Sequence, residues 1–154
     1  MQIQARINHP ALIHQDTMQA LWALKASVEH KGVSAATLAL IELRASQING
    51  CGACVDMHAK MARKAGESDE RLFAVAAWRE APYFDAAERA ALALAEALTR
   101  ISDRPDAVSD EVWDEAARHY DEAALAALVV AIANINVWNR LNVAVRQPVG
   151  AWKG

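Results

Sequence analysis

The hydrophobic pattern of the chain is typical of helices. No run of residues alternates strictly between apolar and polar, as a half-buried β-strand would. Ala, Leu, Glu and Arg, which favour helices, are abundant, whereas the 154 residues include only 6 Gly and 4 Pro. The pattern therefore predicts an all-α fold of about six to seven helices and no sheet.

The first predicted helix begins at Pro10, because proline suits the first position of a helix. Gly32 lies just past its expected end, where glycine commonly terminates a helix. Several apolar residues between these two positions are expected to form much of the buried face. They are Leu12, Ile13, Leu21, Trp22, Leu24 and Val28.

Polar caps and turn residues divide the rest of the chain. Ser34 is expected to cap a second helix, Asn49-Gly50 breaks it, and a third helix runs from about Cys51 to Gly66. The later expected features are a helix capped by Ser68 and ended by Pro82, a capping box of Asp85 with Glu88, and a loop over 101–109. A short helix then precedes a long one over about 122–145.

The long helix is apolar around most of its circumference. Such a helix is usually buried. In a domain of this size, full burial favours a neighbouring subunit, so we expect a homo-oligomer; the alternative is a central helix wrapped by its own chain. The apolar positions are Leu125, Leu128, Val129, Val130, Ile132, Ile135, Trp138 and Leu141.

Composition narrows the class of protein. The length fits one domain over 1–154, and 54% apolar residues argue against disorder. A net charge of −3 does not favour binding to nucleic acid or to an anionic membrane. The N-terminal stretch lacks the features of a signal peptide, and the longest apolar run, 123–133, is shorter than the roughly 20 residues that span a bilayer. We therefore expect a soluble, cytoplasmic protein.

The candidate chemistry lies between Glu42 and His58. Cys51 and Cys54 are three residues apart, so at the start of a helix they share one face, and their sulfurs can close a disulfide if the local geometry permits. The helix dipole there favours a thiolate. His58 is one turn beyond Cys54 and can act as a base, while Glu42, folded back by the Asn49-Gly50 turn, can orient His58. This arrangement predicts a thiol redox site.

Other interpretations of these residues remain open. The same side chains offer zinc three ligands in Cys51, Cys54 and His58, and a fourth in Glu42, although structural zinc sites usually carry a second pair of cysteines or histidines. The pair could also serve a general thiol–disulfide oxidoreductase or a redox sensor that does not turn over peroxide. A metal-stabilised scaffold protein is the alternative from a different class. We expect no cofactor and no metal.

These residues resemble a known family. Glu42, Cys51, Cys54 and His58 match the pattern of the AhpD-like alkylhydroperoxidases, a branch of the carboxymuconolactone decarboxylase superfamily. The sequences at 43–51 and 136–142 resemble that family too, and the resemblance covers roughly residues 10 to 145.

The resemblance implies an all-helical homo-oligomer, a trimer or a hexamer, that reduces hydroperoxides. By this resemblance Cys54 is the peroxide-attacking cysteine, Cys51 is its disulfide partner, and His58 with Glu42 relays protons. A dithiol reductant, either a lipoylated or a thioredoxin-like protein, is the implied electron donor. Ala53 is a departure, since some characterised members carry His or Tyr before the second cysteine. The decarboxylase branch lacks the cysteine pair, which argues against lactone decarboxylation.

Two further groups of polar residues are assigned no catalytic role. We expect His9, His14, His30 and His119 to be surface or capping residues. The polar residues on the apolar last helix could line a pocket, but we favour their pairing with buried polar groups across a subunit interface. They are Asn134, Asn136, Asn139, Arg140 and Asn142.

Overall fold

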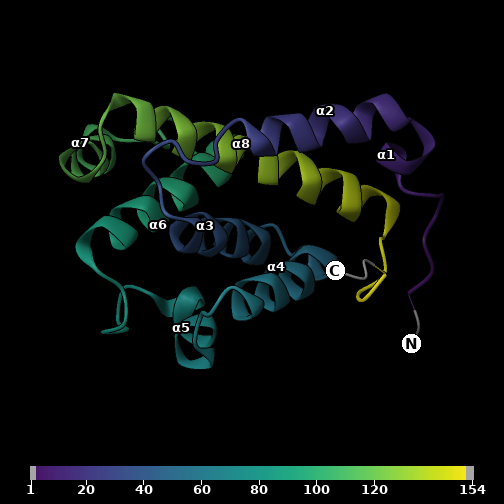
Figure 1. The fold of residues 1–154 in the computed structure, drawn as a ribbon, viewed down its shortest axis with the longest axis horizontal. Helices are drawn as coiled ribbons and strands as arrows, with labels where there is room; N and C mark the ends of the chain where they lie inside the picture. The colour runs from purple at the N-terminus through teal and green to yellow at the C-terminus, as the bar shows by residue number, and fades with distance from the viewer. Residues whose placement is uncertain (1–2, 152–154) are drawn as a thin grey trace.

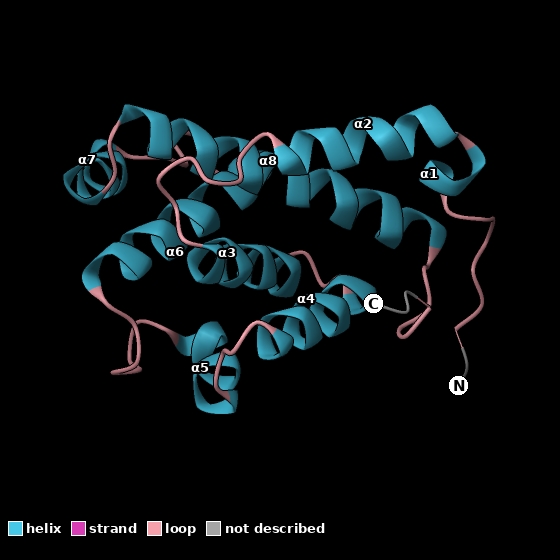
Figure 2. Ribbon diagram, in the orientation of Figure 1, coloured by secondary structure: helices cyan, strands magenta, loops and turns pink. Residues whose placement is uncertain are grey.

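The computed structural model describes residues 3–151, and within that range every regular element is a helix (Figures 1 and 2). The first two residues of the N-terminal stretch considered above lie outside the described residues. Eight α-helices occur in 3–151, rather than six to seven. They are α1 (Pro10–Ile13), α2 (Gln15–Ala26), α3 (Ala35–Ile48), α4 (Gly52–Lys64), α5 (Asp69–Ala74), α6 (Ala86–Thr99), α7 (Asp110–His119) and α8 (Glu122–Val145), with short 3₁₀ turns at Val75–Ala77 and Ile101–Asp103.

The α3 helix occupies the centre of the fold. It packs against α4, α6 and α8, while α2 lies along α8 on the outside (Figure 1). One cluster of buried apolar residues includes Ile41 of α3 with Leu94 and Leu128, and a second includes Leu40 and Leu43 with Leu92. Because successive residues of α3 point into both clusters, the helix is held on opposite sides and is a rigid support for its polar residues.

Most of the expected helix caps are confirmed. The side chains of Ser34 and Ser68 each accept a hydrogen bond from a backbone N–H in the first turn of the following helix. Asp121, which the sequence analysis did not single out, caps α8 in the same way. Asp85 and Glu88 form the complete capping box at the start of α6. These local signals were readable because each cap bonds only to residues within the next turn.

The expectation of one helix from Pro10 to the residues before Gly32 is wrong. His14 has an extended backbone, which separates α1 from α2, and α2 ends at Ala26. Gly32 instead serves the connection to α3: its φ is +85°, and a Cβ atom there would lie 3.1 Å from the Cβ of Ala124. Glycine is needed at this position for both the left-handed backbone and the close approach to α8.

The expected buried face of this region is also wrong for most of its members. Leu21 and Val28 are buried, but the side chains on the outside of α1 and α2 have no helix over them. Leu12 is 56% exposed, Ile13 52%, Trp22 54% and Leu24 38%. Since α2 contacts the rest of the protein through one side against α8, only a narrow stripe of its apolar residues is covered.

The α8 helix begins and ends at the expected residues. Within 3–151 it is the one helix long and apolar enough to cross a membrane by those two criteria, but α2, α3, α6 and α7 pack against it. Leu128, Ile132 and Ile135 are buried by the same chain, as in a core helix. Burial of α8 by its own chain is therefore extensive, and coverage by a second subunit stays a prediction.

Candidate functional site

A tight turn places the two cysteines at the start of α4. Gly50 has a φ of +65°, the left-handed conformation that lets the chain reverse from α3 into α4. Cys51 is the N-cap residue of α4, and its Sγ accepts the backbone N–H of Cys54 at 3.3 Å. The sequence prediction of a cysteine pair at a helix N-terminus is confirmed by this geometry.

Cys51 and Cys54 are joined by a disulfide bond, with their Cα atoms 5.3 Å apart. Both residues are almost fully buried, at 2% and 1% exposure. With both sulfurs bonded to each other, neither is arranged as a metal ligand. Across residues 3–151, moreover, no group of three or more His, Cys, Asp or Glu side chains is arranged to hold a metal ion.

Glu42 and His58 form a buried pair between α3 and α4. Nδ1 of His58 lies 3.2 Å from Oε2 of Glu42, and Nζ of Lys25 approaches Glu42 at 3.5 Å from α2. Burial by itself raises the pKa of Glu42, but the hydrogen bond and charge of His58, together with Lys25, outweigh burial and hold that pKa below its usual value. Glu42 is therefore ionised at neutral pH.

The structure thus brings Glu42 to His58, as the sequence predicted, but it does not bond His58 to a sulfur. No hydrogen bond between His58 and Cys51 or Cys54 occurs in the part of the chain that the structure describes. In this disulfide form the side chain next to Cys54 is Asn142, whose Nδ2 lies 3.4 Å from Sγ of Cys54.

Asn142 was not singled out from the sequence as a site residue. It comes from the last turns of α8 and is 88 positions from Cys54 in the chain. Its short distance to the sulfur depends on how α8 crosses the start of α4, which no local spacing reveals. The unusual polar residues on the apolar last helix were the one signal in the sequence that pointed to Asn142. We interpreted them as part of a subunit interface and not as part of the site.

The interface interpretation is wrong for two of the buried asparagines of α8, Asn136 and Asn139, because both find partners within their own chain. Asn136 and Asn139 both accept hydrogen bonds from Asn49, and Asn139 donates to Ser46 of α3. Asn134 and Asn142 line a cavity, and Arg140 donates to the carbonyl and side chain of Asn136. These groups find partners or a cavity within their own chain because α8 passes directly over the end of α3.

A small cavity of about 60 Å³ lies beside Glu42 and His58, and Asn142, which contacts Cys54, separates it from the cysteine pair. We call it the small cavity beside the cysteine pair. Its polar groups come from Lys25, Glu42, His58, Asn134 and Asn142. Its apolar lining consists of Trp22, Met57, Met61, Ile135 and Trp138. Water occupies about 30 Å³ per molecule in the liquid, so the cavity has room for a few atoms and not for a folded polypeptide.

Two wider openings adjoin this region. One, of about 330 Å³, shares Lys25, Glu42, His58 and Met61 with the small cavity. The other, of about 480 Å³, is a groove lined by Cys51, Asn142 and Arg146 among others. Asn142 contributes to both the small cavity and the groove beside Cys51.

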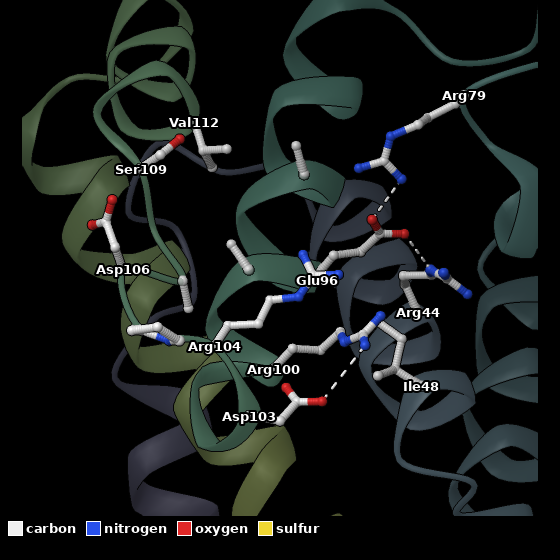
Figure 3. A pocket seen from close by; sticks show the side chains of 14 residues that line it. Arg44, Ile48, Arg79, Glu96, Arg100, Asp103, Arg104, Asp106, Ser109 and Val112 are labelled. Carbon is white, nitrogen blue, oxygen red and sulfur yellow. Dashed lines mark hydrogen bonds and ion pairs between the residues drawn. The ribbon is translucent and has the colours of Figure 1, made fainter.

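A wider cavity, of about 670 Å³, lies elsewhere, and no cysteine or histidine is among the residues that line it (Figure 3). Its centre is Glu96, which accepts hydrogen bonds from Arg44, Arg79 and Trp78. Burial raises the pKa of Glu96, but those three donors more than offset it and leave the pKa below its usual value. We call this region the arginine pocket; its other two arginines are Arg100 and Arg104.

The four histidines set aside from the sequence lie outside the site chemistry. His14, His30 and His119 are exposed, as expected. His9 caps α1 through Nδ1, again as expected, but it is buried and stacks on Trp138 with ring centroids 5.8 Å apart. Burial lowers the pKa of His9.

Comparison with known proteins identifies the family. The sequence pattern of the carboxymuconolactone decarboxylase family matches residues 15–97, a range that contains Glu42, both cysteines and His58. The chain belongs to the carboxymuconolactone decarboxylase family. A relative within it, protein YdfG of Bacillus subtilis (strain 168), is 36% identical over 132 residues, which cover 86% of this chain and 88% of YdfG.

Solved structures place the chain in the AhpD-like branch of this family. A protein of unknown function from Agrobacterium tumefaciens, described as a candidate antioxidant defence protein AhpD, is 34% identical, with a TM-score of 0.88 covering 97% of this chain and 100% of that one. The debrominase Bmp8 has the same fold at 23% identity and a TM-score of 0.76, over 90% of this chain and 74% of Bmp8. The fold of this chain is thus shared by a protein named for debromination.

Proposed function

We propose that the chain is a thiol-dependent peroxidase that reduces organic hydroperoxides. The observation that carries the proposal is the Cys51–Cys54 disulfide at the start of α4, one helical turn from the buried Glu42–His58 pair. A redox-active pair needs a base and a proton donor nearby, and the ionised carboxylate can orient the imidazole for both roles.

The proposed reaction has two steps on the enzyme. The Cys54 thiolate attacks the terminal oxygen of the hydroperoxide, the O–O bond breaks, and the leaving alkoxide takes a proton from His58 to become an alcohol. Cys51 then attacks the sulfenic acid of Cys54, which forms the disulfide and releases water. The disulfide in the structure corresponds to the product of this sequence.

Burial of the sulfurs favours a small substrate over a protein disulfide. Cys51 and Cys54 are nearly inaccessible, and the adjoining cavity of about 60 Å³ admits only a few atoms. A hydroperoxide group has two oxygen atoms, and its carbon chain would lie against Trp22, Met57 and Met61. A general thiol–disulfide oxidoreductase, in contrast, has to expose a sulfur to a folded partner.

A dithiol must return two electrons to complete the cycle. We propose that it attacks Cys51 from the groove of about 480 Å³ beside that residue. A lipoyl group on a carrier protein is slender enough to enter it. A thioredoxin-like protein is the alternative donor, and it would require the groove to widen because Cys51 is buried. Attack on Cys51 releases Cys54 as the thiolate that begins the next cycle.

The proposed setting is a homo-oligomer in the cytoplasm, as a trimer or a hexamer. The apolar residues left uncovered on α1 and α2, Leu12, Ile13, Trp22 and Leu24, support a subunit interface there. Because the cycle depends on thiol reductants, a reducing compartment fits the proposed chemistry.

The proposed function is tested by adding an alkyl hydroperoxide to the reduced, metal-free protein. We expect rapid loss of both thiols, one alcohol formed per disulfide, and steady turnover when dihydrolipoamide is supplied. If hydroperoxide leaves the thiols intact while the reduced protein exchanges rapidly with protein disulfides, the chain is a general oxidoreductase. Inert thiols with stoichiometric zinc after purification would identify a metal-stabilised scaffold instead.

A further inference from the structure

Asn142 is held in one orientation by its own helix. Its Nδ2 donates a hydrogen bond to the carbonyl oxygen of Trp138 at 3.0 Å. A carbonyl only accepts hydrogen bonds, so the nitrogen of the amide, and not its oxygen, must face it. The second hydrogen of Nδ2 remains for Sγ of Cys54, 3.4 Å away.

The value of this contact depends on the redox state of the sulfur. A disulfide sulfur is a weak acceptor, whereas a thiolate is an anion, and hydrogen bonds to ionised groups are roughly twice as strong as neutral ones. Asn142 is 3% exposed, so water competes little with it. The amide is therefore placed to favour the charged form of Cys54 once the disulfide is reduced.

The oxygen of the Asn142 amide indicates the direction from which a reactant reaches the sulfur of Cys54. Oδ1 of Asn142 and Oδ1 of Asn134 are buried, and neither has a hydrogen-bond partner among residues 3–151. Both side chains line the small cavity that also contains His58. Buried acceptors without partners are rare in native structures, so the cavity is suited to a molecule that carries an O–H donor.

We propose that Asn142 is the positioning residue for the reacting sulfur, donating from Nδ2 to stabilise the Cys54 thiolate next to the cavity. This proposal rests on the proposed function in so far as it takes Cys54 as the attacking cysteine. It differs from the family pattern of Glu42, Cys51, Cys54 and His58 in drawing the sulfur's hydrogen-bond donor from α8. Peroxide attack would then require α8 as well as α3 and α4.

The charged groups around the site come from several helices. They are His58 on α4, Glu42 on α3, Lys25 on α2 and Arg146 just after α8. All of them stay in place when Asn142 is replaced, so a change in the titration of Cys54 reports the loss of the amide. The experiment uses the full chain with Cys51→Ser, in which Cys54 is the only thiol.

The rate of alkylation by iodoacetamide is measured against pH. Asn142→Leu is expected to raise the midpoint of that profile by about one pH unit and to slow alkylation at pH 7 about tenfold, because a hydrogen bond to a charged group is lost. Asn142→Ala removes the amide without adding a charge and should raise the midpoint by a similar amount. It also serves if the leucine variant does not fold.

Asn139→Leu is the matched control. Asn139 lies one turn earlier in α8 and is as deeply buried, but it bonds to Ser46 and Asn49 and not to a sulfur. The Asn139→Leu substitution should lower the midpoint temperature of unfolding without moving the alkylation profile. An unmoved profile in both Asn142 variants, or an equal shift in Asn139→Leu, would overturn the proposal.

The outcome is separable from that of the proposed function because alkylation needs no peroxide. If the alkylation profile shifts and the protein does not react with hydroperoxide, Asn142 is supported as the hydrogen-bond donor to the thiolate and peroxidase activity is rejected. Rapid reaction with hydroperoxide together with an unmoved profile would do the reverse.

Discussion

The small cavity beside the cysteine pair and the arginine pocket are lined from the same helix, yet they differ in how their polar groups are satisfied. Glu42 of α3 belongs to the first and Arg44 of α3 to the second. The arginine pocket is roughly ten times larger, at about 670 Å³ against about 60 Å³, but its central carboxylate is already bonded to two arginines and a tryptophan. The small cavity has two buried amide oxygens that find no hydrogen-bond partner among residues 3–151.

This difference indicates that the reactive site is identified by buried polar groups without partners and by reactive side chains, and not by the volume of a cavity. Glu96 is saturated with donors, so it stabilises the packing of α3 against α6 and the segment around Trp78. Glu42 has fewer donors and contacts the imidazole of His58, the type of side chain most often used as a general acid or base. We infer that the first carboxylate serves stability and the second serves reactivity.

The comparison is tested most severely by Cys54→Ser. Peroxide turnover should fall to the uncatalysed background, a loss on the order of a thousandfold or more, because the nucleophile itself is removed. Steady-state alcohol formation with dihydrolipoamide measures this. Turnover that survives in Cys54→Ser would move the attack to Cys51 or out of this cavity.

The next largest effects are expected for the buried pair. Glu42→Gln keeps the shape of the side chain but removes its charge, and should slow the reaction with hydroperoxide by roughly ten- to a thousand-fold, the scale of general acid–base effects. His58→Ala should lose a similar amount. If the two act as one unit, the double variant will lose much less than the product of the single losses.

The pH–rate profiles of the wild type, the two single variants and the double variant provide the check. Glu42 has a pKa below the usual value, so it is expected to be ionised across the neutral range, and loss of its role should appear only in acid. A Glu42→Gln protein whose rate profile matches the wild type would reduce Glu42 to a packing residue.

Glu96→Gln should show the opposite behaviour, with loss of stability and no loss of reactivity. Because the pKa of Glu96 is lowered in the folded state, its ionised form contributes stability above the usual pKa of about 4.5, and that contribution disappears as the pH falls through the lowered value. Removing it should decrease the free energy of unfolding by about 1–3 kcal/mol at pH 7.

Urea titrations of the wild type and Glu96→Gln at pH 7 and at pH 3 measure the difference in their free energies of unfolding. This difference should be smaller at pH 3. The alkylation profile of Cys54 in Glu96→Gln should match that of the parent. Slower thiol chemistry in this variant would show that the two regions are coupled through α3, and would end the distinction drawn between them.

The smallest effect is expected at the rim of the arginine pocket. Arg104 is exposed and follows the short 3₁₀ turn, so Arg104→Gln should change the free energy of unfolding by less than about 0.5 kcal/mol and leave peroxide turnover unchanged. A clear loss of turnover in Arg104→Gln would assign the large pocket a part in the reaction.

Much of the fold and the centre of the site could be predicted from sequence because their determinants are local. Ser34, Ser68 and Asp85 cap helices within one turn, and Cys51, Cys54 and His58 lie on consecutive turns of one helix. Glu42 was placed correctly since a single turn at Asn49-Gly50 joins its helix to theirs.

What could not be predicted depends on how distant helices cross. Asn142 reaches Cys54 only because α8 passes the start of α4, and the chain between them is 88 positions long. The exposure of Leu12 and Trp22 likewise depends on which side of α2 lies on α8, which the spacing of apolar residues in a short helix leaves open.

The account's central claim is that a hydroperoxide is attacked by Cys54 from the small cavity. The most direct measurement is mass spectrometry of the Cys51→Ser protein after one equivalent of an alkyl hydroperoxide, since without Cys51 the intermediate cannot proceed to the disulfide. The account predicts a gain of one oxygen, about 16 mass units, on the peptide that contains Cys54, in a form that a sulfenic-acid reagent traps. An unmodified Cys54 with the hydroperoxide unconsumed would contradict it.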